Sequence, residues 1–149
     1  MKQVVKTFLV IVVLIGQQPS CSSRETTPML IRIAESGESI KVRNEACEQL
    51  GIRKDTAAVP ALVRFLDDPV LQWCAARSLG QIADARATSS LRAHLVLLDS
   101  SGVNRMAVWA LGLIGDTSAA GDLTALESSP LLNAQDSSAI REALTRLRR

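Results

Sequence analysis

The chain is poor in aromatic rings and in histidine. Only 3% of its 149 residues are aromatic, with two Phe, two Trp and no Tyr. A core without rings has to be built from Ala, Val and Leu, which suits closely stacked helices. The single histidine, His94, has no Cys or His at metal-ligand spacing around it. We therefore expect no metal site and interpret His94 as a solvated surface residue.

An excess of one charge and a phosphate-binding loop are also missing. The 17 basic and 15 acidic residues give a formal net charge of +2, and Lys2 and Lys6 lie in a segment that we expect to be removed. A near-neutral chain lacks the concentrated basic face that nucleic acid requires. No Gly-rich segment has phosphate-binding spacing. We expect neither a nucleic-acid partner nor a cofactor.

The N-terminus has the pattern of an export signal. Residues 1–20 begin with two lysines and continue into an apolar run at 8–15, too short to span a bilayer comfortably. Cys21 follows, and the segment resembles a bacterial lipoprotein signal, in which this Cys is lipidated and becomes the mature N-terminus. The resemblance implies a membrane-tethered envelope protein with a short linker at 21–26. Ser22 would favour the outer membrane where lipoproteins are sorted by that residue.

Two alternatives to lipidation remain open at this point. Ordinary cleavage one or two residues after Cys21 would give a free periplasmic protein. An uncleaved apolar run would be a bare N-terminal membrane anchor.

One phrase recurs three times, at intervals of about 30 residues, which is typical of a repeat array. A Leu-Gly pair is followed at constant spacing by an Asp, in Leu50-Gly51 with Asp55, Leu79-Gly80 with Asp84, and Leu111-Gly112 with Asp116. An apolar stripe at i, i+4 and i+8 precedes each copy, as in Val42, Ala46 and Leu50, and predicts a helix.

The repeated Gly and Asp predict a turn between two helices. Gly51, Gly80 and Gly112 lie near the ends of the first helices, where Gly tolerates positive φ or a close backbone approach. Asp55, Asp84 and Asp116 precede second helices predicted at about 57–67, 86–98 and 118–127. There a carboxylate accepts hydrogen bonds from free N–H groups. We therefore interpret all six residues as structural caps, and the three Asp residues are not catalytic candidates.

The pattern continues beyond the three copies. Residues 27–33 match 59–65 position by position, and a helix predicted at about 136–148 matches the first helices. The predicted domain at 27–149 is all-α, a short α-solenoid of about eight helices with half-repeats at both ends.

Three features of the sequence resemble the HEAT-like repeats first described in phycobilisome lyases. They are the motif Val-Arg-x-x-Ala-x-x-x-Leu-Gly, the Asp that follows it at a fixed spacing, and a helix that begins Ala-Val-Pro-Ala-Leu-Val. The resemblance covers about residues 27–148 and implies second helices lining an inner face. On that face we expect a partner-binding strip of outward side chains: Arg64, Asp67, Asp68, Arg92, His94, Asp122 and Thr124.

The two cysteines that follow Cys21 each allow two interpretations. Cys47 and Cys74 lie on adjacent first helices, two positions out of alignment, and a two-residue step turns a helical side chain by about 200°. We expect two separate buried thiols, with a disulfide as the alternative.

Trp73 and Trp109 occupy positions that are polar in other copies. They either pack against neighbouring elements or anchor a partner.

These patterns predict a non-enzymatic protein-interaction or scaffold module of the bacterial envelope. A lyase-type or chaperone-like activity is the alternative implied by the resemblance. The second alternative is a structural solenoid that associates with itself end to end.

Overall fold

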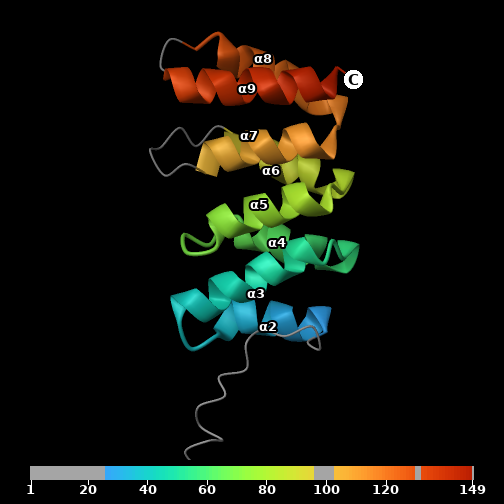
Figure 1. The fold of residues 1–149 in the computed structure, drawn as a ribbon, viewed down its shortest axis with the longest axis vertical. Helices are drawn as coiled ribbons and strands as arrows, with labels where there is room; N and C mark the ends of the chain where they lie inside the picture. Colours follow the sequence, from blue (N-terminus) through green and yellow to red (C-terminus); the bar gives the residue numbers. More distant parts are fainter. Residues whose placement is uncertain (1–25, 96–102, 130–131, 149) are drawn as a thin grey trace, which may run out of the picture.

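The computed structural model describes residues 26–95, 103–129 and 132–148, and this part of the chain contains α-helices and 3₁₀ helices but no strand. The helices stack in chain order into a column (Figure 1). The α-helices are α2 (Thr27–Ser36), α3 (Ile40–Ile52), α4 (Val59–Phe65), α5 (Gln72–Ile82), α6 (Thr88–Leu95), α7 (Val103–Ile114), α8 (Ala120–Glu127) and α9 (Ala134–Leu147). The predicted all-α solenoid is confirmed.

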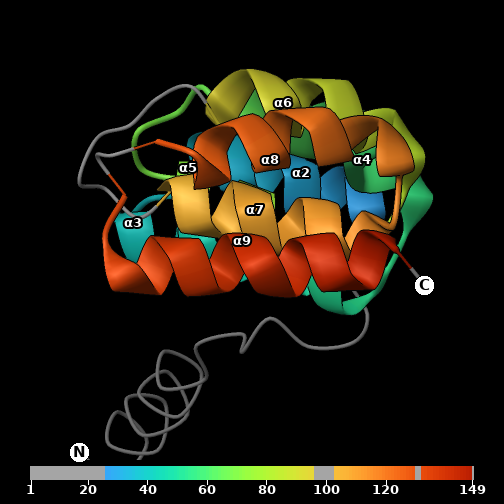
Figure 2. The same cartoon turned by 90° about the horizontal axis from the view of Figure 1, so that it is seen from above.

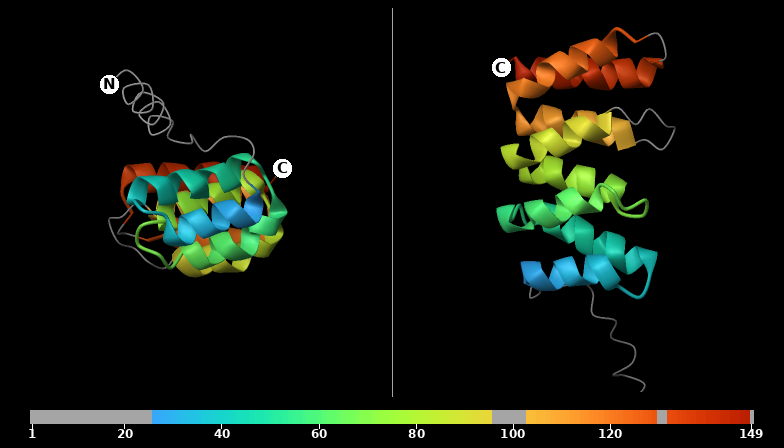
Figure 3. Two further views of the ribbon diagram at one scale, coloured as in Figure 1. Left: turned by 90° about the horizontal axis from the view of Figure 1, so that it is seen from below. Right: turned by 180° about the vertical axis from the view of Figure 1, so that it is seen from behind.

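The column has two layers, which Figures 2 and 3 show from its ends and from behind. The first helices α3, α5, α7 and α9 form one layer and contact one another in succession. The second helices α2, α4, α6 and α8 form the other layer, and each packs mainly on the first helix that follows it. Contacts between successive second helices are much weaker.

The core is aliphatic, as the shortage of rings predicts. Most of the largest fully buried side chains are leucines, one or two from almost every helix: Leu30, Leu50, Leu62, Leu66, Leu71, Leu79, Leu91, Leu95, Leu111 and Leu123. Alanines fill the space between neighbouring first helices, where Ala46, Ala75, Ala107 and Ala110 are all completely buried.

The repeated glycines lie inside the first helices, because α3, α5 and α7 continue past Gly51, Gly80 and Gly112. A Cβ on Gly80 would stand 2.8 Å from the Cα of Ala110, and one on Gly112 would stand 2.9 Å from the Cα of Ala143. The cap function predicted for the three glycines is therefore wrong. Close approach between neighbouring first helices is the reason for a glycine at these positions.

The left-handed residue of each turn comes three positions after the glycine. Lys54 has φ 53°, Ala83 has φ 58° and Gly115 has φ 76°. Each stands directly before the repeated Asp, and Ala83 is the C-cap residue that follows the last residue of α5, Ile82. Only the third copy has a glycine where the backbone is left-handed, so the first two copies carry strain there.

The three aspartates begin the second helices. Asp55 accepts a hydrogen bond from the Ala57 N–H at 2.9 Å, and Asp84 and Asp116 do the same two residues ahead. Each bond opens a single 3₁₀ turn: η1 (Thr56–Ala58), η2 (Ala85–Ala87) and η3 (Thr117–Ala119). The α-helical part of each second helix therefore starts later than predicted.

The two ends of the column follow the expected pattern with small differences. Pro28 lies in the first turn of α2, where no donor is lost. The last helix begins at Ala134, with the Asn133 side chain accepting a hydrogen bond from the Asp136 N–H at 2.9 Å. The signal segment at 1–20, Cys21 and the predicted continuation of α6 to residue 98 lie outside the described residues.

Candidate interaction surface

Contacts between ionisable side chains connect the second helices to one another along the column. Three of them join a second helix, or for Asp67 the turn that follows α4, to the next second helix, and the fourth joins α8 to α9. The pairs are Glu35–Arg64 at 2.9 Å, Asp67–His94 at 3.3 Å, Asp122–Arg92, and Glu127–Arg141 at 2.9 Å. We call these four pairs the charge ladder.

The charge ladder contains most of the predicted partner-binding strip. Arg64, Asp67, Arg92, His94 and Asp122 are all members and are engaged within the molecule. A partner would therefore meet paired charges at these positions, and each such pair contributes little to stability at the surface.

The other two residues of the strip are also engaged. Asp68 pairs with Arg43 of α3 and accepts the Val70 N–H at 2.8 Å. Burial acts to raise the pKa of Asp68, but the Val70 N–H and the Arg43 guanidinium outweigh it and hold this pKa below the usual value. The Thr124 hydroxyl donates to the Ala120 carbonyl at 2.8 Å.

His94 is not the solvated surface residue that we expected, because its side chain is only 13% exposed. Its Nδ1 lies 2.8 Å from the Ser90 carbonyl oxygen, and its Nε2 lies 3.3 Å from an Asp67 carboxylate oxygen. The ring stands one position before the buried Leu95, and its Asp67 partner lies in the turn that follows α4. His94 therefore connects two repeats.

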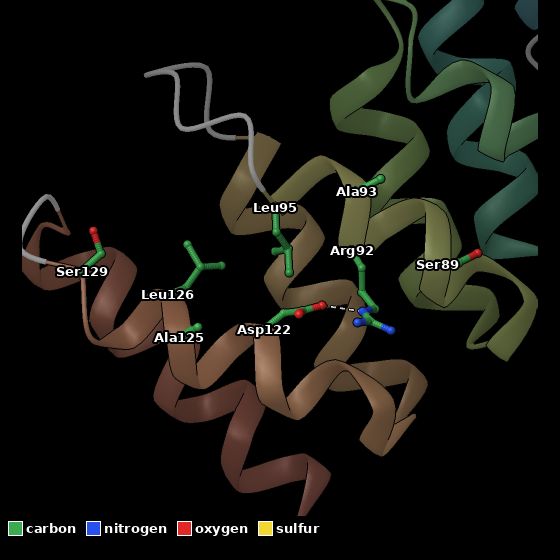
Figure 4. Close-up of a pocket in the computed structure, with 8 residues that line it drawn as sticks. All are labelled: Ser89, Arg92, Ala93, Leu95, Asp122, Ala125, Leu126 and Ser129. Atoms are coloured by element: carbon green, nitrogen blue, oxygen red, sulfur yellow. Dashed lines mark hydrogen bonds and ion pairs between the residues drawn. The ribbon is translucent and has the colours of Figure 1, made fainter.

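A groove opens between α6 and α8, on the surface formed by the second helices (Figure 4). Its volume is about 610 Å³. Its lining combines apolar side chains with a few polar ones and comprises Ser89, Arg92, Ala93, Leu95, Asp122, Ala125, Leu126 and Ser129. The Arg92 and Asp122 side chains reach toward each other across the groove, as the dashed line in Figure 4 marks. An apolar groove with a few fixed polar groups is the usual form of a binding site.

The charge of the groove is balanced. The Asp122 carboxylate accepts a hydrogen bond from the Arg92 guanidinium and raises the pKa of that arginine. A ligand of strong single charge would have to break this pair, whereas an apolar side chain flanked by neutral polar groups would leave it intact. The groove therefore suits a neutral, partly apolar chain segment.

Two alanines create the groove. Ala93 and Ala125 stand nine residues after Asp84 and Asp116, and both are exposed. The same position of the first copy holds Arg64, whose long side chain reaches Glu35. Our sequence interpretation missed Ser89, Ala93, Leu95, Ala125, Leu126 and Ser129, although the replacement of Arg by Ala in the later copies is a signal that the sequence contains.

The two tryptophans differ in their surroundings. Trp73 is 46% exposed, and the guanidinium of Arg77 lies 5.7 Å from its ring centroid while also pairing with Glu48 at 2.9 Å. Trp109 is partly buried and packs against the core beside Gly80. Trp109 therefore packs against a neighbouring helix, and Trp73 presents part of its ring to solvent.

The two described cysteines are free and buried, with exposures of 0% for Cys47 and 5% for Cys74. The expectation of two free, buried thiols is confirmed, but the two side chains lie beside each other and are not apart as their misalignment suggested. Cys74 Sγ donates to the Asn44 carbonyl of α3 at 3.5 Å, one turn before Cys47. The alignment argument fails because neighbouring first helices meet with an offset of two positions, as Gly51 opposite Ser78 and Gly80 opposite Ala110 show, and this offset equals the misalignment of the two cysteines.

Within the residues that the structure describes, no group of three or more His, Cys, Asp or Glu side chains is arranged to hold a metal ion. In the same part of the chain, no helix has the length and apolar character that crossing a membrane requires.

Comparison with known proteins agrees with this architecture. Residues 27–97 match the family described as HEAT repeats. A chain in the solved complex of CpcE and CpcF of phycocyanin lyase from Nostoc sp. PCC7120 is similar in fold, with a TM-score of 0.72 and 24% sequence identity. The match covers 89% of this chain but only 57% of that one, and no curated protein matches. Residues 27–97 therefore resemble HEAT repeats, and the chain has the fold of a HEAT-like solenoid.

Proposed function

We propose that this protein is a non-enzymatic interaction module that binds a segment of another protein in the groove between α6 and α8. The observation that carries the proposal is the groove itself, with its two exposed alanines and its internally paired Arg92 and Asp122. The proposed occupant is a neutral segment that places an apolar side chain between Ala93 and Ala125. The exposed Ser89 of the lining can form a hydrogen bond to its backbone.

Association of one solenoid with another protein also has a parallel among solved structures. The chain that resembles this one belongs to a complex of two proteins, CpcE and CpcF. By analogy, a short array of HEAT repeats would present one surface to a protein partner.

Photo-crosslinking tests the binding site. A photoreactive amino acid is placed at Ala125 in the groove and, as a control, at Glu45, which is exposed on α3 in the other layer. In the cell of origin, Ala125 should give a discrete crosslinked product that Glu45 does not give. Equal products from the two positions, or none from Ala125, would contradict the proposal.

We further propose that lipid on Cys21 tethers the module to a membrane of the bacterial envelope. The apolar run at 8–15 followed by Cys21 supports this location. Radioactive palmitate should label the full chain, and Cys21→Ala should abolish the label. An unmodified chain that takes up no label would favour the other locations, a free periplasmic protein or a bare N-terminal anchor, and a label that survives the substitution would contradict lipidation at Cys21.

A lyase-type or chaperone-like activity is the second candidate, and its support is the similarity to a chain of phycocyanin lyase. A bilin-transfer assay with purified chain and acceptor protein tests it. Chromophore attachment above the rate without the chain would favour this candidate over a module that only binds.

A further inference from the structure

Cys47 and Cys74 form a thiol pair across the contact between α3 and α5. Cys47 lies on α3 in the first helix pair, and Cys74 lies on α5 in the second. Neither residue contributes to the groove or to the charge ladder. Two buried thiols on neighbouring repeats are therefore left without a function in the proposed binding site.

Two hydrogen bonds bracket the pair and fix the register of the two helices. Cys74 Sγ donates to the Asn44 carbonyl at 3.5 Å, and Ser78 Oγ donates to the Cys47 carbonyl at 2.9 Å. Cys74 thus faces the turn of α3 between residues 44 and 47. One turn further on, a Cβ on Gly51 would stand 2.7 Å from the Cα of Ser78. The backbones of α3 and α5 are therefore too close at this site for a side chain at residue 51.

The environment of the two thiols is unequal. Interaction with Cys47 is the main cause that lowers the pKa of Cys74, and Ser78 and Arg77 act in the same direction. The same interaction, together with burial, raises the pKa of Cys47. Cys74 also has the larger exposure, 5% against 0%. An external reagent would therefore react first at Cys74.

We propose that Cys47 and Cys74 are a redox site that closes to a disulfide and covalently ties the first helix pair to the second. The co-reactant is a small disulfide or an oxidised dithiol protein. The Cys74 thiolate attacks one sulfur of that disulfide and releases one thiolate. The Cys47 sulfur, after losing its proton, attacks Cys74 Sγ and releases the second thiolate. Two protein thiols are oxidised, and one external disulfide is reduced to two thiols.

The bond would close a loop that contains η1, α4 and the start of α5. Closing such a loop restricts the unfolded chain and raises the thermal midpoint of a domain of this size by about 10 °C. The proposal does not depend on the partner-binding function, and its test does not use a partner.

The test uses the full chain carrying Cys21→Ser, so that only Cys47 and Cys74 remain. After exposure to oxidised glutathione under native conditions, trypsin should release the peptides 44–53 and 65–77 as one disulfide-linked species. The thermal midpoint should rise by about 10 °C and return to its original value with reductant.

The matched control adds Cys47→Ala, which leaves Cys74 as the only thiol. This variant should accept one glutathione and show no reductant-dependent rise in midpoint. In the chain with both thiols, a lasting single glutathione adduct at Cys74 would overturn the proposal. Two thiols that stay unmodified would also overturn it, as would a linked species with no rise in the midpoint.

Discussion

Gly80 and Ala110 lie where α5 and α7 approach most closely: a Cβ on residue 80 would stand 2.8 Å from the Cα of Ala110. The same relation joins Gly51 to Ser78 and Gly112 to Ala143. Each pair combines a glycine with a small residue of the next first helix, which stands two positions before the residue equivalent to that glycine: Gly80, Gly112 and, in α9, Thr145. The close packing of the first-helix layer therefore follows from a pattern repeated in the sequence.

Gly80→Ala should lower the free energy of unfolding by about 1–3 kcal/mol, because the new methyl group meets backbone that has to move. Gly121→Ala in α8 is the matched control, since a Cβ there would meet nothing within 4 Å. The control should gain up to about 1 kcal/mol from helix propensity. Urea denaturation of both variants measures the difference. Equal effects of the two substitutions would refute the account of the glycines.

Substitutions at the left-handed residues of the turns should change the free energy of unfolding in opposite directions in the second and third copies. Ala83→Gly should raise the free energy of unfolding by about 1 kcal/mol, because it removes strain at φ 58°. Gly115→Ala should lower it by a similar amount, although its Cβ would have free space around it. Chemical denaturation at constant pH measures both. A loss of stability in Ala83→Gly would contradict this explanation.

The capping aspartates predict a loss of stability in acid. Hydrogen bonds from the Arg86 side chain and the Arg86 N–H hold the pKa of Asp84 below its usual 3.8. Asp55 and Asp116 have lowered pKa values for similar reasons, with the Thr27 hydroxyl as the main cause at Asp55 and the Ser118 N–H at Asp116. A carboxyl whose pKa is lower in the folded state stabilises the protein above its unfolded value. That contribution is lost as the pH falls through the folded value.

Asp84→Asn should therefore lower the urea midpoint at about pH 7, and its difference from the unmodified chain should shrink as the pH falls below about 3.8. Glu38→Gln, at an exposed residue, is the control and should change the midpoint little at any pH. A difference that is constant across the titration would show that the Asp84 charge is not involved.

The ends of the column predict a monomer. If another copy extended the column, its first helix would pack on α3 or on α9 through a contact like that of Gly80 with Ala110. At the corresponding positions α3 has Gln49 and α9 has Thr145. Both are larger than the small residues or glycines that occupy the equivalent internal positions. We expect the full chain with Cys21→Ser, in a mild detergent, to show the mass of one copy by light scattering. A concentration-dependent increase would instead favour the self-associating solenoid.

The sequence allowed the helices and the Asp caps to be predicted, because both depend on neighbours within one turn. The glycines were located correctly but given the wrong function, since a repeated Gly does not show whether its helix continues. The charge ladder could not be predicted, because Arg92 and Asp122 come from different repeats and meet only in the folded column. The groove was predictable in principle from Ala93 and Ala125, which occupy the position that Arg64 occupies in the first copy.

Blocking the groove tests the central claim most directly. The photoreactive residue is placed at Ala93, and its crosslinked product is measured in chains carrying either Ala125→Arg or Glu45→Arg. The first substitution fills the groove with the side chain type that Arg64 supplies in the first copy, and the second places the same side chain on the opposite layer. We predict that Ala125→Arg removes the product while Glu45→Arg retains it, with the same thermal midpoint in both. A product that survives Ala125→Arg would contradict the claim that this groove binds the partner.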